Sequence, residues 1–144
     1  DHVVILHEMV HDARIVPLDG RDHLPDDVRQ WMGDSRGHWE GDTLVVESRN
    51  YTGLTASFSP SVTMAAGDGT TLHLTERFSR IAEDTLLYEF TVDDPTTFTQ
   101  PLSASIPMKP GEPMFEYACH EGNHGLLNIL RGAREAELDG SEGQ

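Results

Sequence analysis

The segment over residues 37–46 constrains the fold of this chain more than any other part of the sequence. Residues that favour β-strands lie on both sides of Gly41, and glycine at the first central position of a two-residue turn is what a type II′ hairpin requires. In that register Trp39 lies opposite Leu44 on one face of the hairpin. The segment therefore predicts two antiparallel strands joined by a tight turn.

Similar runs recur along the chain, and they share β-branched and aromatic residues bounded by turn signals. Besides the hairpin at 37–46, predicted strands cover residues 3–10, 14–18, 71–81, 85–92, 98–108 and 114–119. Pro25 and the acidic residues after it suit a short helix near residues 26–32. Asn123 is placed to cap an amphipathic helix, whose apolar stripe includes Leu126 and Leu130.

These strands, about seven to eight in meander order, predict an all-β, mainly antiparallel fold, either a small barrel or a strongly curved sheet. Closure into a barrel also removes exposed strand edges. We expect residues 1–138 to form a single β domain with the C-terminal helix covering it, and residues 139–144 to form a flexible tail. A chain of 144 residues is long enough to fold around one core without disulfides.

The acidic composition argues against two classes of partner. With 25 acidic and 10 basic residues, the chain has a formal net charge of −15, which repels the phosphates of nucleic acid and an anionic membrane surface. We therefore expect no nucleic-acid partner and no membrane partner. Whether the chain forms a homo-oligomer stays open. Cys119 is the only cysteine, so no internal disulfide framework forms. Because the chain begins at Asp1 rather than at methionine, we expect a preceding segment to have been removed.

Several segments of the chain carry a resemblance to known proteins. They are L-D-G-R at residues 18–21, W-M-G-D-S-R-G-H-W-E-G-D-T-L-V-V at 31–46, T-E-R-F at 75–78, Y-E-F-T-V-D-D-P at 88–95 and Y-A-C-H-E-G-N at 117–123. On these segments the sequence resembles an uncharacterised family of bacterial proteins that are often exported. The resemblance implies a single recurring domain and a periplasmic or secreted location, and it transfers no catalytic residue.

Glu76 is the polar residue whose position most strongly suggests chemistry. It falls between Leu74 and Phe78 on the apolar face of its predicted strand. A carboxylate in such a place is costly unless it is paired or faces a wet cavity, and a buried carboxyl group can serve as a general acid or base. Two interpretations follow: a structural bond from Glu76 to an arginine or to the backbone, or a catalytic group that includes His120 and Arg77.

The first functional hypothesis is a small-molecule-binding β-barrel. Its cavity would be lined by Trp39, Tyr88, Phe90 and Tyr117, since an apolar cavity with a few convergent polar groups is the usual site for a small molecule. A catalytic version would be a cofactor-free lyase, isomerase or hydrolase that uses the carboxylate and histidine in the lumen. Whether the chain is an enzyme stays open, and a structural or interaction domain without catalysis is an alternative.

A further alternative is a metal-dependent small-barrel enzyme that uses the histidines of the chain. The residues from His7 to His11 and from His120 to His124 both match the H-E-x-x-H pattern of zinc peptidases. That pattern needs a helix, whereas the first match lies in a predicted strand, where positions four apart are separated by ~13 Å. The second match lies at a predicted junction of strand and helix. These four histidines are therefore candidates for a divalent metal in the alternative, and the first hypothesis needs no cofactor.

Overall fold

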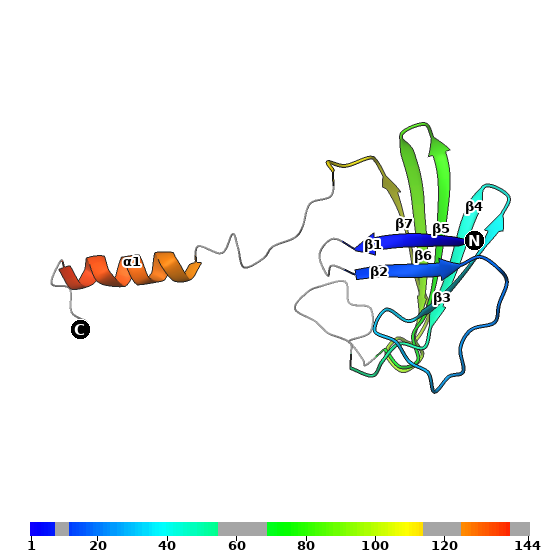
Figure 1. Cartoon of the computed structure of the whole chain (residues 1–144), viewed down its shortest axis with the longest axis horizontal. Coiled ribbons are helices and arrows are strands. Elements are labelled where there is room, and N and C mark those ends of the chain that lie inside the picture. Colours follow the sequence, from blue (N-terminus) through cyan, green and yellow to red (C-terminus); the bar gives the residue numbers. More distant parts are fainter. Residues whose placement is uncertain (8–11, 55–68, 114–124, 139–144) are drawn as a thin grey trace. The chain divides into compact units, whose positions relative to one another are not determined.

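The computed structural model describes residues 1–7, 12–54, 69–113 and 125–138. Its elements are β1 (His2–His7), β2 (Asp12–Pro17), β3 (Asp34–Glu40), β4 (Thr43–Arg49), β5 (His73–Ala82), β6 (Thr85–Asp93), β7 (Leu102–Met108) and α1 (Gly125–Leu138) (Figure 1). The chain divides into two compact units, one with all seven strands and the other with α1. No helix in the described residues is both long and apolar enough to cross a membrane.

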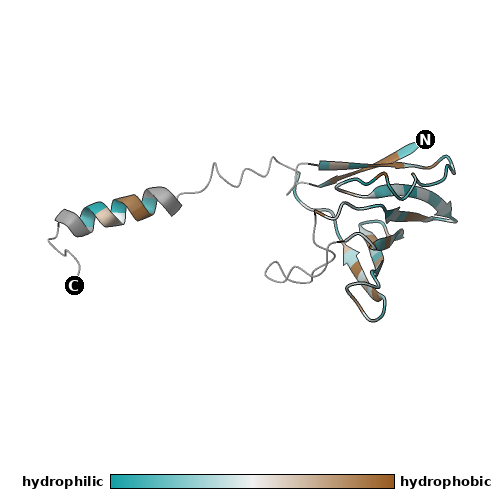
Figure 2. Ribbon diagram, turned by 90° about the horizontal axis from the view of Figure 1, so that it is seen from below, coloured by the Kyte–Doolittle hydropathy of each residue, from teal (hydrophilic) through white to brown (hydrophobic). Residues whose placement is uncertain are grey.

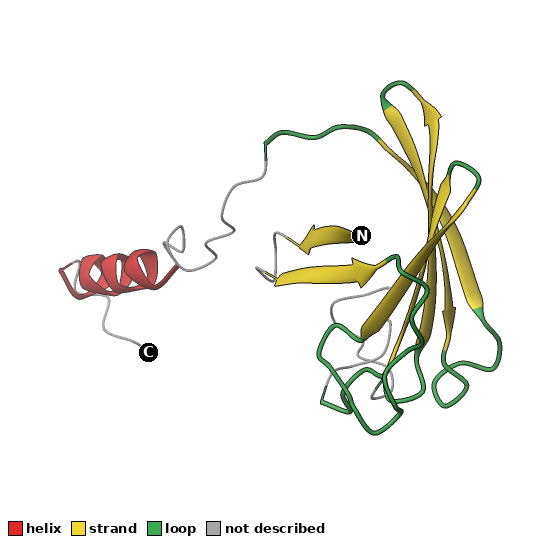
Figure 3. Ribbon diagram, turned by 45° about the vertical axis from the view of Figure 1, so that its right-hand side comes forward, coloured by secondary structure: helices red, strands yellow, loops and turns green. Residues whose placement is uncertain are grey.

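The strands form two antiparallel sheets. One is a five-stranded sheet in which β3 to β7 lie in sequence order, and the other is the hairpin of β1 and β2 (Figure 3). The predicted mainly antiparallel all-β fold is therefore confirmed. A closed barrel is not confirmed, because β3 and β7 do not pair with each other within the described part of the chain.

The hairpin of β3 and β4 has the predicted register. Trp39 lies opposite Leu44, and Glu40 opposite Thr43, so the turn consists of two residues. Gly41 has a φ of 60°, the left-handed value that the first central position of a type II′ turn requires. Glycine reaches this conformation without the steric cost that a Cβ atom imposes.

The two faces of the five-stranded sheet differ in polarity. Strand register aligns mostly apolar side chains in rows on one face, which we call the inner face. One row is Leu44, Phe78, Tyr88 and Ile106, and the next is Val46, Glu76, Phe90 and Ala104. The opposite, outer face carries mostly polar and charged residues, so hydropathy alternates along the strands (Figure 2).

The hairpin of β1 and β2 packs on the part of the inner face that β3, β4 and β5 form. Val16 is fully buried and makes the core with Leu44 and Val46. Gly37 gives the hairpin room to approach the sheet, because a Cβ atom there would lie 2.7 Å from Leu18 Cδ2 and 2.8 Å from Val16 Cγ1. Figure 1 shows the two short strands crossing the longer ones.

The predicted short helix near residues 26–32 is wrong. The chain there forms turns and an isolated bridge between Gln30 and Tyr51. The Gln30 N–H donates to the Asn50 carbonyl at 2.9 Å, and the Gln30 carbonyl accepts from Thr52 N–H at 3.0 Å. Bonds to a distant segment thus use the backbone groups that a helix would pair locally. The predicted strand at 114–119 and the cap at Asn123 lie outside the described residues.

The C-terminal helix exists as α1, in a compact unit separate from the one that holds the strands. It covers Gly125–Leu138, in agreement with the predicted amphipathic helix at this end of the chain. The prediction that its apolar stripe covers the sheet stays a prediction.

Candidate ligand-binding site

Glu76 lies on the inner face, where the alternation of its strand predicts it, and it is paired with Arg14 of the hairpin. Arg14 Nη1 donates to Glu76 Oε2 at 2.7 Å, and Arg14 Nη2 donates to Glu76 Oε1 at 3.0 Å. The two side chains are 6% and 5% exposed. This is a two-point, charge-assisted pair in which the planar guanidinium matches the carboxylate, the strongest geometry available to such groups.

Tyr88 adds a third hydrogen bond to this pair. Its hydroxyl donates to Glu76 Oε1 at 2.9 Å. Burial raises the pKa of Tyr88, and the negative charge of Glu76 and the hydrogen bond to it raise it further. Tyr88 therefore keeps its proton at neutral pH and acts as a hydrogen-bond donor toward Glu76.

Two serines extend the polar cluster toward β3. Arg14 Nη1 donates to Ser48 Oγ at 3.5 Å, and the hydroxyls of Ser48 and Ser35 are 2.7 Å apart. Both serines are buried, and burial raises the pKa of the nearby Tyr51 to about 12. The cluster is thus a water-poor set of hydrogen bonds that join β2, β3, β4, β5 and β6.

Burial alone would lower the pKa of Arg14, but the hydrogen bond and the negative charge of Glu76 outweigh it and leave the pKa raised. The guanidinium is therefore always charged. Its Nε–H is buried and has no acceptor within the described residues. The pair with Glu76 leaves the site close to neutral, so it favours a neutral ligand over an ionic one.

Aromatic rings connect the polar cluster to the rest of the inner face. The rings of Phe78 and Tyr88 stack with centroids 5.0 Å apart, and those of Tyr88 and Phe90 are 5.5 Å apart. Beyond them, the inner face of β7 is open to solvent: Leu102 is 40% exposed, and Ile106 is 45% exposed. We call the inner face of β6 and β7 the open half, since the core with the hairpin forms on other strands; its exposed residues lie on β7, and Val92 of β6 is fully buried.

The structure brings together some of the residues that the sequence predicts for a site. Glu76, Tyr88 and Phe90 share the inner face and lie in contact or in neighbouring rows. Trp39 shares that face at the far end of β3, where it is 58% exposed. Arg77 points to the outer face and donates to Glu40 Oε2 at 2.8 Å, so it does not join Glu76.

The histidine and C-terminal candidates are only partly described. Tyr117, His11, His120 and His124 lie outside the described residues. His7 ends β1, and its Nε2 is buried with no hydrogen-bond partner in the part of the chain that the structure describes. Among those same residues, no group of three or more His, Cys, Asp or Glu side chains is arranged to hold a metal ion.

Arg14 is the site residue that the sequence interpretation missed. It alternates with Val16 along β2, so both point to the same side of the hairpin, and both are buried. A charged residue in phase with a core valine is the signal that could have identified Arg14. It does not reveal the partner, because Glu76 is 62 positions away in the sequence.

Comparison of the chain with protein-family models, with curated proteins and with solved structures finds no match to any of them.

Proposed function

We propose that this protein binds a neutral, mainly apolar small molecule on the open half of the inner face, beside Tyr88. The observation that supports the proposal is the position of Tyr88. Its hydroxyl is fixed by the buried Arg14–Glu76 pair, while its ring continues the aromatic row from Phe78 to Phe90. An apolar surface with one fixed polar group is the usual composition of a small-molecule site.

The hydrogen bonds of Glu76 favour ligand binding over catalysis as the function of this site. Both of its oxygens accept from Arg14, and Oε1 also accepts from Tyr88. This carboxylate is only 5% exposed, and its three hydrogen bonds hold it inside the protein rather than toward a ligand on the open half. Glu76 therefore orients the hydroxyl of Tyr88, and the ligand contacts Tyr88 rather than Glu76.

Titration with the neutral dye Nile red tests the proposal. We expect fluorescence that rises and saturates at one dye per chain, since the proposed site is apolar and the dye is neutral. Ala104→Trp fills the open half opposite Phe90 and should abolish the saturable signal, whereas Ser105→Trp, on the outer face of the same strand, should leave it unchanged. Equal signals from the two variants would contradict the proposal. If the dye binds as expected, mass spectrometry of solvent extracts of the purified protein would identify the natural ligand.

A further inference from the structure

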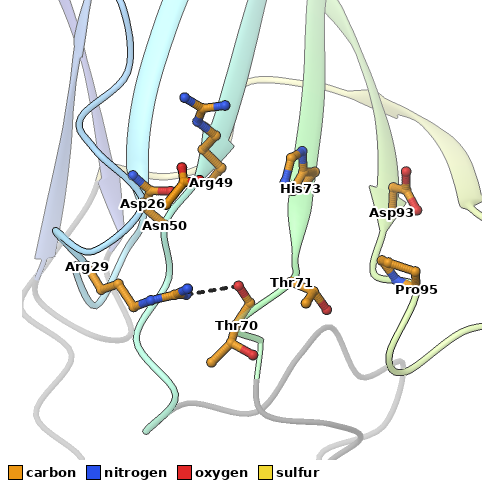
Figure 4. A pocket seen from close by; sticks show the side chains of 9 residues that line it. All are labelled: Asp26, Arg29, Arg49, Asn50, Thr70, Thr71, His73, Asp93 and Pro95. Atoms are coloured by element: carbon orange, nitrogen blue, oxygen red, sulfur yellow. Dashed lines mark hydrogen bonds between the residues drawn. The ribbon is translucent and has the colours of Figure 1, made fainter.

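A second site lies at the opposite side of the sheet, where β4 and β6 end and β5 begins. A pocket of about 400 Å³ lies there, within the range of small-molecule sites. Its walls come from the turn before β3, the end of β4, the start of β5 and the end of β6 (Figure 4). The described residues that line it are Asp26, Arg29, Arg49, Asn50, Thr70, Thr71, His73, Asp93 and Pro95.

Two arginines distinguish this pocket from the rest of the acidic surface. Several other basic side chains of the described part are paired with carboxylates: Arg14, Arg21, Arg36, Arg77 and Lys109. Arg29 and Arg49 form no ion pair within the described residues. Arg80, Arg131 and Arg134 also have no ion pair among the described residues, but Arg29 and Arg49 line one pocket together, in a chain with a net charge of −15.

Arg49 also has an unsatisfied donor. Its Nε is buried and has no acceptor in the part of the chain that the structure describes. A buried N–H group without an acceptor costs free energy. Because the guanidinium is a planar set of donors, the ligand group that suits it is an oxyanion.

The walls of the pocket are held in place before any ligand binds. Arg29 Nη1 donates to the Tyr51 carbonyl at 3.0 Å. It also donates to the Thr70 carbonyl at 2.9 Å (Figure 4), and the two bonds tie separate segments together. Asn50 has a φ of 61°, and its Nδ2 donates to the carbonyls of Leu24 and Pro25. A non-glycine residue held at positive φ is a strained feature that persists where the surroundings fix it, often at a binding site.

We propose that this pocket binds a small molecule through a carboxylate or phosphate group, with Arg49 and Arg29 as the recognising cations. Asp26 and Asp93 also line the pocket, and they oppose an anion. Both are exposed, so water and salt screen their repulsion. Arg49 is half-buried, so its charge is screened less than those of the two carboxylates.

The test follows the nitrogen-15 signals of the arginine Nε–H groups in the full chain during titrations with inorganic phosphate and, separately, with acetate. We expect the signals of Arg49 and Arg29 to shift and saturate. A response to phosphate alone identifies a phosphate-bearing ligand, and a response to acetate alone identifies a carboxylate. No response to either anion, or equal shifts of all arginine signals, would overturn the proposal.

Variants connect the response to the pocket. Arg49→Gln should weaken binding about tenfold, the effect of losing one charge-assisted hydrogen bond. Arg49→Lys should weaken it less, because the charge remains and only the planar fork is lost. Arg77→Gln removes an outer-face arginine that is already paired with Glu40, and it should leave binding unchanged. If Arg77→Gln weakens binding as much as Arg49→Gln, the response reflects general surface charge and the proposal is wrong.

Discussion

Arg14 and Glu76 are 62 residues apart in the sequence, and they form the ion pair that joins the β1–β2 hairpin to the middle of the five-stranded sheet. Two hydrogen bonds of 2.7 and 3.0 Å connect them, and both side chains are almost fully buried. The pair therefore has two roles: it fixes the hairpin on the inner face, and it orients the hydroxyl of Tyr88.

Glu76→Gln should destabilise the protein by about 3–5 kcal/mol, because it leaves the buried charge of Arg14 without its counter-ion. Arg77→Gln is the matched control, since the neighbouring Arg77 belongs to an exposed pair with Glu40 and should cost less than about 1 kcal/mol. Chemical denaturation of both variants measures the difference. Equal midpoints would show that the buried pair does not hold the fold.

Gly37→Ala tests the approach of the hairpin to the sheet. The new methyl group would lie within 3 Å of side-chain atoms of Leu18 and Val16, and Val16 is fully buried. We expect a loss of about 1–3 kcal/mol, the usual cost of overpacking a core. Gly111→Ala meets no atom within 4 Å and should be near neutral in the same thermal-melting experiment. An unchanged melting temperature for Gly37→Ala would place the hairpin elsewhere.

Gly41→Val tests the type II′ turn. Open space surrounds Gly41, so the cost arises from its positive φ alone. A β-branched residue at that φ should lose about 1–3 kcal/mol of stability. Gly111→Val, which has the same open surroundings and no positive φ, is the control. A melting temperature close to that of the control would remove the turn assignment.

The acid stability of the fold should depend on Asp34. Burial alone would raise the pKa of this carboxyl group, but hydrogen bonds from Leu24 N–H, His23 and Arg36 hold it below its ordinary value. Because the pKa is lower in the folded state, the charge of Asp34 stabilises the fold above the unfolded value of about 3.9. This contribution disappears as the pH falls through the folded value.

Asp34→Asn should therefore lose about 1–3 kcal/mol at neutral pH and should unfold with a shallower dependence on acid than the parent. Denaturation at a series of pH values down to about 2 measures both effects. Asp27→Asn, at an exposed position, should follow the parent throughout. If the parent and Asp34→Asn lose stability in parallel, the carboxylate of Asp34 is not the responsible group.

The local parts of the fold could be predicted because their causes are local. Gly41 indicates a tight turn, and the alternation of polar and apolar residues around Glu76 places its carboxylate on the apolar face. The prediction of a short helix near residues 26–32 was wrong for the opposite reason. Its sequence signals are local, but the backbone of Gln30 bonds to Asn50 and Thr52, which no nearby residue indicates.

The sequence predicts which residues of β5 and β6 reach the candidate site, but it does not predict which arginine pairs with Glu76. Alternation on β5 and β6 brings Glu76, Tyr88 and Phe90 to one face. Which arginine reaches Glu76 depends on the way the hairpin crosses the sheet, so Arg77, next in sequence, is the wrong partner and Arg14 is the right one. The pocket with Arg29 and Arg49 assembles from separate segments and has no sequence motif.

A methyl NMR titration of the full chain with Nile red reports which face of the sheet the ligand contacts. Leu86, Leu102 and Ile106 present their methyl groups on the inner face of β6 and β7, and Leu87 is an internal control on the outer face. We predict saturable shifts for the first three and none for Leu87. Shifts at Leu87 with none at Ile106, or no saturable shift at any methyl group, would contradict the proposed binding site.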